Sequence, residues 1–258
     1  MCRDGTRALV NPATDAGSGG ARLAPNRPRL LHPRSDMDGA TLLLDLALIV
    51  GSYLCGSIPM GVVVARLTGG VDPRTVGSGR TGGTNALRAL GRRRAAIVVT
   101  GDLLKGAVPV LVARLVAGEA IIEVLCGLAA VAGAIWSIFV GFRSGRGVGT
   151  GVGTMLVIQP IAVLLATPVF VLVILVTRYV SLGSLLASAA LFPAMLLIWA
   201  VASGAVHPQY LVYAVIGPAL IWVAHADNID RLIHGTERKF DLGMLARRGG
   251  RGGGAAER

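Results

Sequence analysis

Two long stretches without charged side chains dominate the C-terminal half of this sequence. Residues 147–177 and 179–224 contain no Asp, Glu, Lys or Arg, and shorter runs of the same kind cover residues 46–65 and 124–142. A helix that crosses the hydrocarbon core of a bilayer needs about 20 residues. The 258-residue chain is 53% hydrophobic and only 15% charged. These features predict an all-α, polytopic integral membrane protein.

Helix-breaking residues divide the apolar runs into shorter segments. The pair Gln159-Pro160, the stretch from Arg178 to Gly183, and the pair His207-Pro208 are the clearest breaks. We therefore expect about seven helices, the fourth of them short, at residues 41–66, 95–117, 120–142, 147–158, 161–177, 183–203 and 209–225.

The apolar segments belong to a membrane domain that we expect at residues 41–242. Residues 1–40 are rich in Pro, Gly, Ser and Ala without periodicity, a composition typical of disorder. We interpret them as a disordered leader, with Met37 as an alternative start of the protein. Residues 243–258 are predicted to form a disordered basic tail.

The distribution of the net charge of +11 indicates membrane topology rather than nucleic-acid binding. The arginines cluster between apolar segments, and positive charge accumulates in cytoplasmic loops. Residues 66–94 contain seven arginines and a single acid, whereas Glu119 and Glu123 follow the second expected helix. We therefore expect residues 66–94, residues 143–146 and the C-terminal segment on the cytoplasmic side, and we expect no nucleic-acid partner.

A glycine-rich stretch at residues 77–88 has the composition of an anion site. Its glycines leave backbone N–H groups accessible to a ligand, and hydroxyl, amide and guanidinium groups follow at Ser78, Thr84, Asn85 and Arg88. A flexible loop with solvated arginines is the alternative. The clustering of these groups favours phosphate binding, although the lysine spacing of a Walker loop is absent.

A second glycine-basic stretch, residues 141–150, precedes the short fourth helix. Arg143 and Arg146 lie beside a predicted helix N-terminus, where unpaired N–H groups favour anions. The glycines from Gly147 to Gly153 also suit close helix packing. Both interpretations can hold together, and two anion sites indicate two phosphorylated substrates.

A third polar stretch, residues 225–237, begins where the last expected helix ends. His225 and Asn228 share one helical face. We interpret Asp227, Asp230 and Arg231 as a solvated exit turn. The spacing of His225 and Asp230 also matches the His-x4-Asp pattern of acyl-CoA-dependent acyltransferases, but residues five apart point in different directions on a continuous helix.

These stretches, in this order, resemble the bacterial acyl-phosphate:glycerol-3-phosphate acyltransferases, the PlsY family. The resemblance covers most of residues 41–242 and rests on the segments 56–61, 77–79, 82–85, 87–88, 102–106, 228–232 and 235–237. It implies a seven-helix enzyme of the bacterial cell membrane with its active site on the cytoplasmic face. The implied reaction transfers a fatty acyl group from acyl phosphate to the 1-hydroxyl of glycerol 3-phosphate, giving lysophosphatidic acid and phosphate.

The chain departs from the family pattern mainly in the second stretch. Ala134 and Ser137 replace the usual histidine and proline, Ser144 replaces a glycine, and Arg146 replaces a lysine. In the first stretch, Arg80 stands where the family usually has asparagine. Charge is kept at residue 146, but arginine and lysine are not interchangeable.

The resemblance also implies roles for individual residues. Catalytic roles fall on Ser78, Arg88, His225 and Asn228, and substrate-binding roles fall on Thr84, Asn85, Lys105, Gly145, Arg146, Gly147 and Glu237. Neither a cofactor nor a metal is expected, because acyl phosphate is already activated. Two alternatives stay open: an acyltransferase that uses acyl-CoA or acyl carrier protein, and a transporter of a small phosphorylated solute, which Asp102 and Lys105 within an apolar segment also fit.

Overall fold

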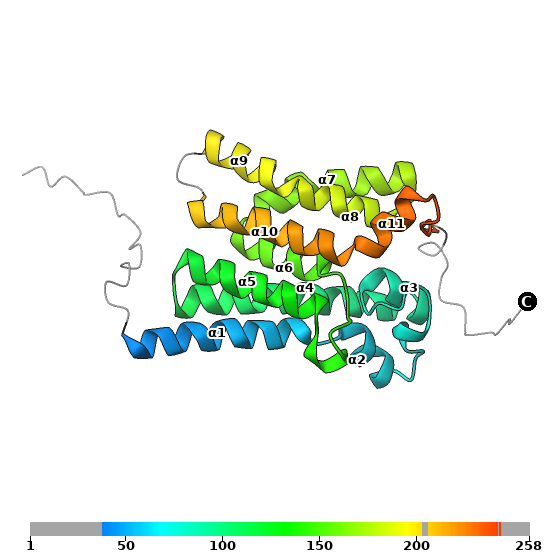
Figure 1. Cartoon of the computed structure of the whole chain (residues 1–258), viewed down its shortest axis with the longest axis horizontal. Helices are drawn as coiled ribbons and strands as arrows, with labels where there is room; N and C mark the ends of the chain where they lie inside the picture. The colour runs from blue at the N-terminus through cyan, green and yellow to red at the C-terminus, as the bar shows by residue number, and fades with distance from the viewer. Residues whose placement is uncertain (1–37, 203–205, 242, 244–258) are drawn as a thin grey trace, which may run out of the picture. The chain divides into compact units, whose positions relative to one another are not determined.

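The computed structural model describes residues 38–202, 206–241 and 243. Within these ranges every regular element is a helix (Figure 1), so the predicted all-α class is confirmed. The α-helices are α1 Gly39–Ser57, α2 Met60–Leu67, α3 Gly83–Leu90, α4 Arg92–Val116, α5 Ala120–Ile135, α6 Val148–Ile158, α7 Pro160–Thr177, α8 Val180–Ala189, α9 Leu191–Val201, α10 Pro208–Ala224 and α11 Ala226–Ile233. Two 3₁₀ turns, η1 Pro73–Thr75 and η2 Ile138–Val140, complete them.

Five helical segments of the described chain are long and apolar enough to cross a membrane. They are α1, α4, α5 continued through η2, α7, and α8 continued through α9. The pair α10 and α11, bent by 65°, adds a sixth if it counts as one span. The fourth expected segment, at residues 147–158, is α6, an apolar helix of 11 residues. The expected count of seven is therefore approximate.

The first expected helix is broken, which corrects the prediction of a continuous segment at 41–66. Helix α1 ends at Ser57 and α2 starts at Met60, because Pro59 has no N–H group and keeps the preceding Ile58 out of the helical region (ψ 115°). Likewise, the segment expected at 183–203 starts at Val180 and is divided at Ala190. Met37 and the expected leader up to residue 37 lie outside the described residues, and so does the expected basic tail except for Gly243.

Glycines allow close approach between pairs of helices. A Cβ atom at Gly106 in α4 would overlap the carbonyl oxygen of Thr150 in α6, and one at Gly153 would overlap that of Leu103. The same relation joins α1 and α5 through Gly56 and Gly133, which face the backbone of the other helix. The packing role expected for the glycines of α6 is therefore confirmed, as small residues permit backbone contact between membrane helices.

The lateral surfaces of these helices are apolar. Large hydrophobic side chains such as Leu43, Leu115, Leu164 and Val176 are between 68% and 75% exposed. A buried cluster that includes Val110, Val124, Met155, Met195 and Tyr213 forms the core. Exposed apolar side chains around a buried core suit helices that contact lipid.

We predict that Gly106→Ala destabilises the protein, whereas Gly51→Ala does not. The added methyl group at residue 106 meets the α6 backbone, and overpacking costs about 1–3 kcal/mol. A Cβ atom at the exposed Gly51 in α1 meets no atom within 4 Å, and alanine there gains about 0.5–1 kcal/mol of helix stability. Thermal unfolding of both variants in the same detergent checks this. Equal melting temperatures would contradict the packing role of Gly106.

Candidate active site

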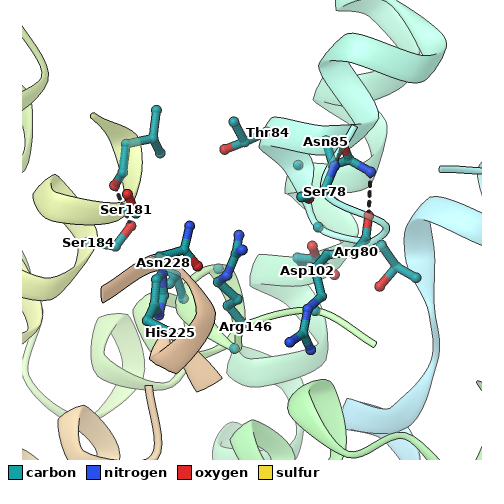
Figure 2. Close-up of a pocket in the computed structure, with 18 of the residues that line it drawn as sticks. Ser78, Arg80, Thr84, Asn85, Asp102, Arg146, Ser181, Ser184, His225 and Asn228 are labelled. Atoms are coloured by element: carbon teal, nitrogen blue, oxygen red, sulfur yellow. Dashed lines mark hydrogen bonds between the residues drawn. The ribbon is translucent and has the colours of Figure 1, made fainter. Parts of the chain in front are cut away.

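A polar cavity of about 250 Å³ lies where the loop before α3 meets the N-termini of α3 and α6 and the polar faces of α8 and α11. In Figure 2, Asn228 and Arg146 lie between Ser181 and Ser184 on the left and Ser78 and Asn85 on the right. The structure brings every residue with an expected role to this cavity, namely Ser78, Thr84, Asn85, Arg88, Lys105, Gly145, Arg146, Gly147, His225, Asn228 and Glu237.

Two helix N-termini contribute to the cavity wall. Gly82 caps α3 and Gly147 caps α6, and neither helix has a side-chain cap on its first N–H groups. Both caps and the residues that follow them line the cavity. Uncapped helix N-termini carry partial positive charge and hydrogen-bond donors, so each of them can hold an anion.

The buried amide of Asn85 organises the glycine-rich loop. Its Nδ2 lies within hydrogen-bonding distance of the carbonyl oxygens of Pro73 (2.6 Å), Val76 (3.1 Å) and Arg80 (2.8 Å). Its Oδ1 accepts a hydrogen bond from the N–H of Ser78 at 3.0 Å. The amide is thereby committed to the loop backbone, and the hydroxyls of Ser78 and Thr84 lie beside it in the wall.

The loop before α6 is held against α5 and against the first glycine-rich loop. The N–H of Gly145 donates to the carbonyl oxygen of Ala134 at 3.0 Å, so this donor is already used. The hydroxyls of Thr81 and Ser144 lie 2.9 Å apart and join the two loops. Gly147 adopts a φ of +76°, a left-handed conformation that glycine allows without steric cost.

Three cations of the cavity, Lys105, Arg231 and Arg80, have a carboxylate within ion-pair distance, and Asp227 is the partner of Arg80. The Nζ atom of Lys105 lies 2.9 Å from Asp102 and donates to the carbonyl oxygen of Ile58 at 3.1 Å. This second bond satisfies the carbonyl at the break between α1 and α2. Arg231 pairs with Glu237, with Nε 2.8 Å from Oε2.

Three other arginines of the cavity, Arg88, Arg146 and Arg238, have no carboxylate within ion-pair distance among the described residues. Burial, and then the charge of Arg80, lowers the pKa of Arg146 to about 10, and its buried Nε has no hydrogen-bond partner. Burial, followed by the charge of Arg238, lowers the pKa of Arg88. Both guanidinium groups are still protonated at neutral pH, so the cavity carries unmatched positive charge.

Glu237 joins α8 and α11 at the cavity wall. Its Oε1 accepts hydrogen bonds from the Ser181 hydroxyl (2.8 Å) and from Nδ2 of Asn228 (2.6 Å), and its Oε2 accepts from Arg231. Burial raises the pKa of Glu237, but these hydrogen bonds outweigh it and hold the pKa below its ordinary value. Since Nδ2 is engaged, the Oδ1 atom of Asn228 is left as a buried acceptor with no partner among the described residues.

His225 occupies the bend between α10 and α11. Its Nδ1 lies 2.8 Å from the carbonyl oxygen of Ile221. A carbonyl only accepts hydrogen bonds, so Nδ1 carries the proton and Nε2 is the free acceptor of the neutral ring. Asp230 is exposed and contacts His234 instead, so the His-x4-Asp pattern does not form a hydrogen-bonded pair here.

Several residues of the cavity were missed by the sequence analysis. Ser181 was expected in a break between spans and Ser184 in the apolar helix after it, yet both lie on α8 and line the cavity. Their spacing of three at the start of an apolar helix was the available signal. Arg231, which we expected in a solvated exit turn, is instead ion-paired with Glu237 at the cavity wall. Arg143 is exposed and lies outside the cavity.

A second cavity, also of about 250 Å³, adjoins the first and is mostly apolar. Val148, Phe170 and Ser184 line both cavities. The other walls come from α6, α7, α8, α9 and α10, with side chains such as Met155, Val163 and Ile221. A polar cationic cavity thus continues into a space suited to a hydrocarbon chain.

Comparison with known proteins identifies relatives along most of the chain. The profile of the family described as glycerol-3-phosphate acyltransferase matches residues 46–235. A glycerol-3-phosphate acyltransferase of Trichlorobacter lovleyi is 43% identical over 192 residues, which cover 74% of this chain and 95% of the relative. Glycerol-3-phosphate acyltransferase 3 of Dehalococcoides mccartyi is 41% identical over 208 residues, covering 76% and 95%.

Two crystal structures of PlsY, an integral membrane glycerol 3-phosphate acyltransferase, share the fold. The glycerol 3-phosphate form has a TM-score of 0.71 at 36% identity and covers 80% of this chain and 100% of the PlsY chain. The lysophosphatidic acid form has a TM-score of 0.70 at the same identity, covering 79% and 100%. With a matching profile, close relatives and a common fold, this chain belongs to the glycerol-3-phosphate acyltransferase family.

Proposed function

We propose that this membrane enzyme transfers a fatty acyl group from acyl phosphate to the 1-hydroxyl of glycerol 3-phosphate, forming lysophosphatidic acid and inorganic phosphate. The observation that carries the proposal is the unmatched positive charge of one cavity. Two uncapped helix N-termini and three arginines without carboxylate partners surround it. Two phosphate groups, one on each substrate, supply the missing negative charge.

Glycerol 3-phosphate is assigned to the side formed by the glycine-rich loop and α3. Arg88 and the N-terminus of α3 bind its phosphate, and the hydroxyls of Ser78 and Thr84 hydrogen-bond to it. Asn85 acts through the loop conformation, because its amide is fully engaged there. Lys105 adds positive charge while it anchors the break between α1 and α2.

Acyl phosphate is assigned to the side formed by α6. Arg146 and the N–H groups that follow Gly147 bind its phosphate, and Gly145 keeps the loop close to α5. The acyl chain extends past Val148 and Phe170 into the apolar cavity. This arrangement leaves the carbonyl carbon at the junction of the two cavities.

The reaction requires positioning and charge stabilisation rather than a covalent intermediate on the protein. The 1-hydroxyl attacks the carbonyl carbon, the new ester bond forms, and the bond between that carbon and the phosphate oxygen breaks. The departing phosphate takes the hydroxyl proton. Nε2 of His225 and Oδ1 of Asn228 are free acceptors that orient the attacking hydroxyl, and Glu237 fixes the Asn228 amide.

The donor is tested with purified protein, glycerol 3-phosphate, and either palmitoyl phosphate or palmitoyl-CoA. We expect product with palmitoyl phosphate, and we expect Asp230→Ala to stay within about twofold of the parent, because Asp230 is exposed and does not contact His225. Activity with palmitoyl-CoA alone, abolished by Asp230→Ala, would instead support the acyl-CoA alternative.

The two phosphate sites are separated by Arg88→Ala and Arg146→Ala. Loss of a charge-assisted hydrogen bond costs about 1.5–3 kcal/mol, or about one to two decades. Arg88→Ala should raise the KM for glycerol 3-phosphate, and Arg146→Ala should raise the KM for acyl phosphate. Initial rates with each substrate varied in turn measure this. If both variants change the KM of the same substrate, the assignment of two sites is wrong.

We also propose that the cavity opens to the cytoplasm of a bacterial cell, since the arginine-rich segments surround it. In a cysteine-free background, a cysteine replacing Arg93 should be protected from an impermeant thiol reagent in intact cells. A cysteine replacing Glu119, at the other end of α4, should react. Permeabilised cells provide the control in which both react. Labelling at residue 93 without permeabilisation would reverse the proposed orientation.

A further inference from the structure

Arg80 lies in the cavity wall, next to α11. It takes no part in the reaction proposed above. Its Nη2 atom lies 3.0 Å from Oδ2 of Asp227. This ion pair joins the glycine-rich loop to α11, 147 residues apart in the sequence. The Arg80 side chain is 25% exposed and that of Asp227 is 63% exposed, so the carboxylate lies on the solvent side of the pair.

The guanidinium of Arg80 has spare hydrogen-bonding capacity. Arginine offers five N–H donors, and the bond to Asp227 is the one side-chain hydrogen bond that Arg80 makes within the described chain. Its backbone, by contrast, is fixed, because Nδ2 of Asn85 donates to its carbonyl oxygen. The side chain therefore pivots from a fixed point in the cavity wall.

The charge of Arg80 acts on the site proposed for acyl phosphate. Arg80 and Arg146 line the same cavity, and the charge of Arg80 is, after burial, the largest influence that lowers the pKa of Arg146. Asp227 offsets this repulsion only in part, because an exposed ion pair is screened by water and contributes little. A phosphate would satisfy both guanidinium groups, and charge-assisted bonds to phosphate are stronger than an exposed ion pair.

We propose that Arg80 exchanges Asp227 for the phosphate of the acyl donor and so sets the affinity for that phosphate together with Arg146. Asp227 is then a competitor that holds Arg80 while the cavity is empty. This inference rests on the proposed acyl-phosphate donor. Removing Arg80 should therefore weaken phosphate binding, whereas removing Asp227 should strengthen it. If the ion pair had only a structural role, removing either partner would change phosphate binding in the same direction.

The test uses the full-length protein in detergent and the variants Arg80→Gln, Arg80→Lys, Asp227→Asn and the double variant Arg80→Gln with Asp227→Asn. Arg93→Gln is the matched control, because it removes the same charge from an exposed position outside the cavity. Two quantities are measured: the Kd for inorganic phosphate from its effect on the melting temperature, and the KM for palmitoyl phosphate. The first requires no turnover, so it separates a failure of the Arg80 inference from a failure of the proposed donor.

We expect Arg80→Gln to raise the Kd for phosphate and the KM for palmitoyl phosphate about tenfold, at the lower end for a charge-assisted bond. Arg80→Lys should recover part of this loss, and Arg93→Gln should change neither quantity. Asp227→Asn should lower the Kd for phosphate and the KM for palmitoyl phosphate about threefold in the parent. In the Arg80→Gln background it should change neither. The inference is overturned if Asp227→Asn weakens phosphate binding as Arg80→Gln does. It is equally overturned if Asp227→Asn strengthens binding without Arg80, or if Arg80→Gln behaves like Arg93→Gln.

Discussion

The backbone contact between α4 and α6 is the constraint on which the site depends. Because Gly106 and Gly153 have no side chains, the two helices approach until the backbone of each meets the Cα atoms of the other. This contact fixes the short helix α6 beside Asp102 and Lys105, and Gly149 also abuts Asp102. The N-terminus of α6 thereby opens into the cavity rather than into lipid, where its unpaired N–H groups would cost several kcal/mol.

The second organising feature is an excess of positive charge in a confined space. Lys105 and Arg231 have carboxylate partners, while Arg88, Arg146 and Arg238 lack them within the described residues. These unpaired guanidinium groups repel one another, and a bound phosphate would reduce that repulsion. In the proposed reaction, binding and catalysis draw on the same charges, since phosphate is both part of the proposed donor and the leaving group.

The polar network around Glu237 gives the site its orientation. Three donors from α8 and α11 converge on one carboxylate, and the Asn228 amide is turned so that its oxygen is free. At the bend between α10 and α11, the carbonyl oxygen of Ile221 accepts a hydrogen bond from Nδ1 of His225. This bond fixes the tautomer and leaves Nε2 as an acceptor. The two residues that carry these acceptors line a cavity whose other walls offer mainly donors, which suits the hydroxyl of the proposed acceptor substrate.

Composition and charge spacing were enough to predict the membrane class and the order of the apolar helices, and the family resemblance pointed to the eleven residues that gather at the cavity. Hydrocarbon requires long uncharged helices, and polar groups among them are tolerated only at a site. Which polar atoms are free depends instead on contacts between distant segments. Asn85 was expected to contact substrate but is committed to its loop, whereas Arg231, taken for a solvated residue, is held at the wall by Glu237. The helix break at Pro59 and the pairing of Arg80 with Asp227 were likewise hidden, because hydrogen bonds between distant segments depend on packing rather than on local sequence pattern.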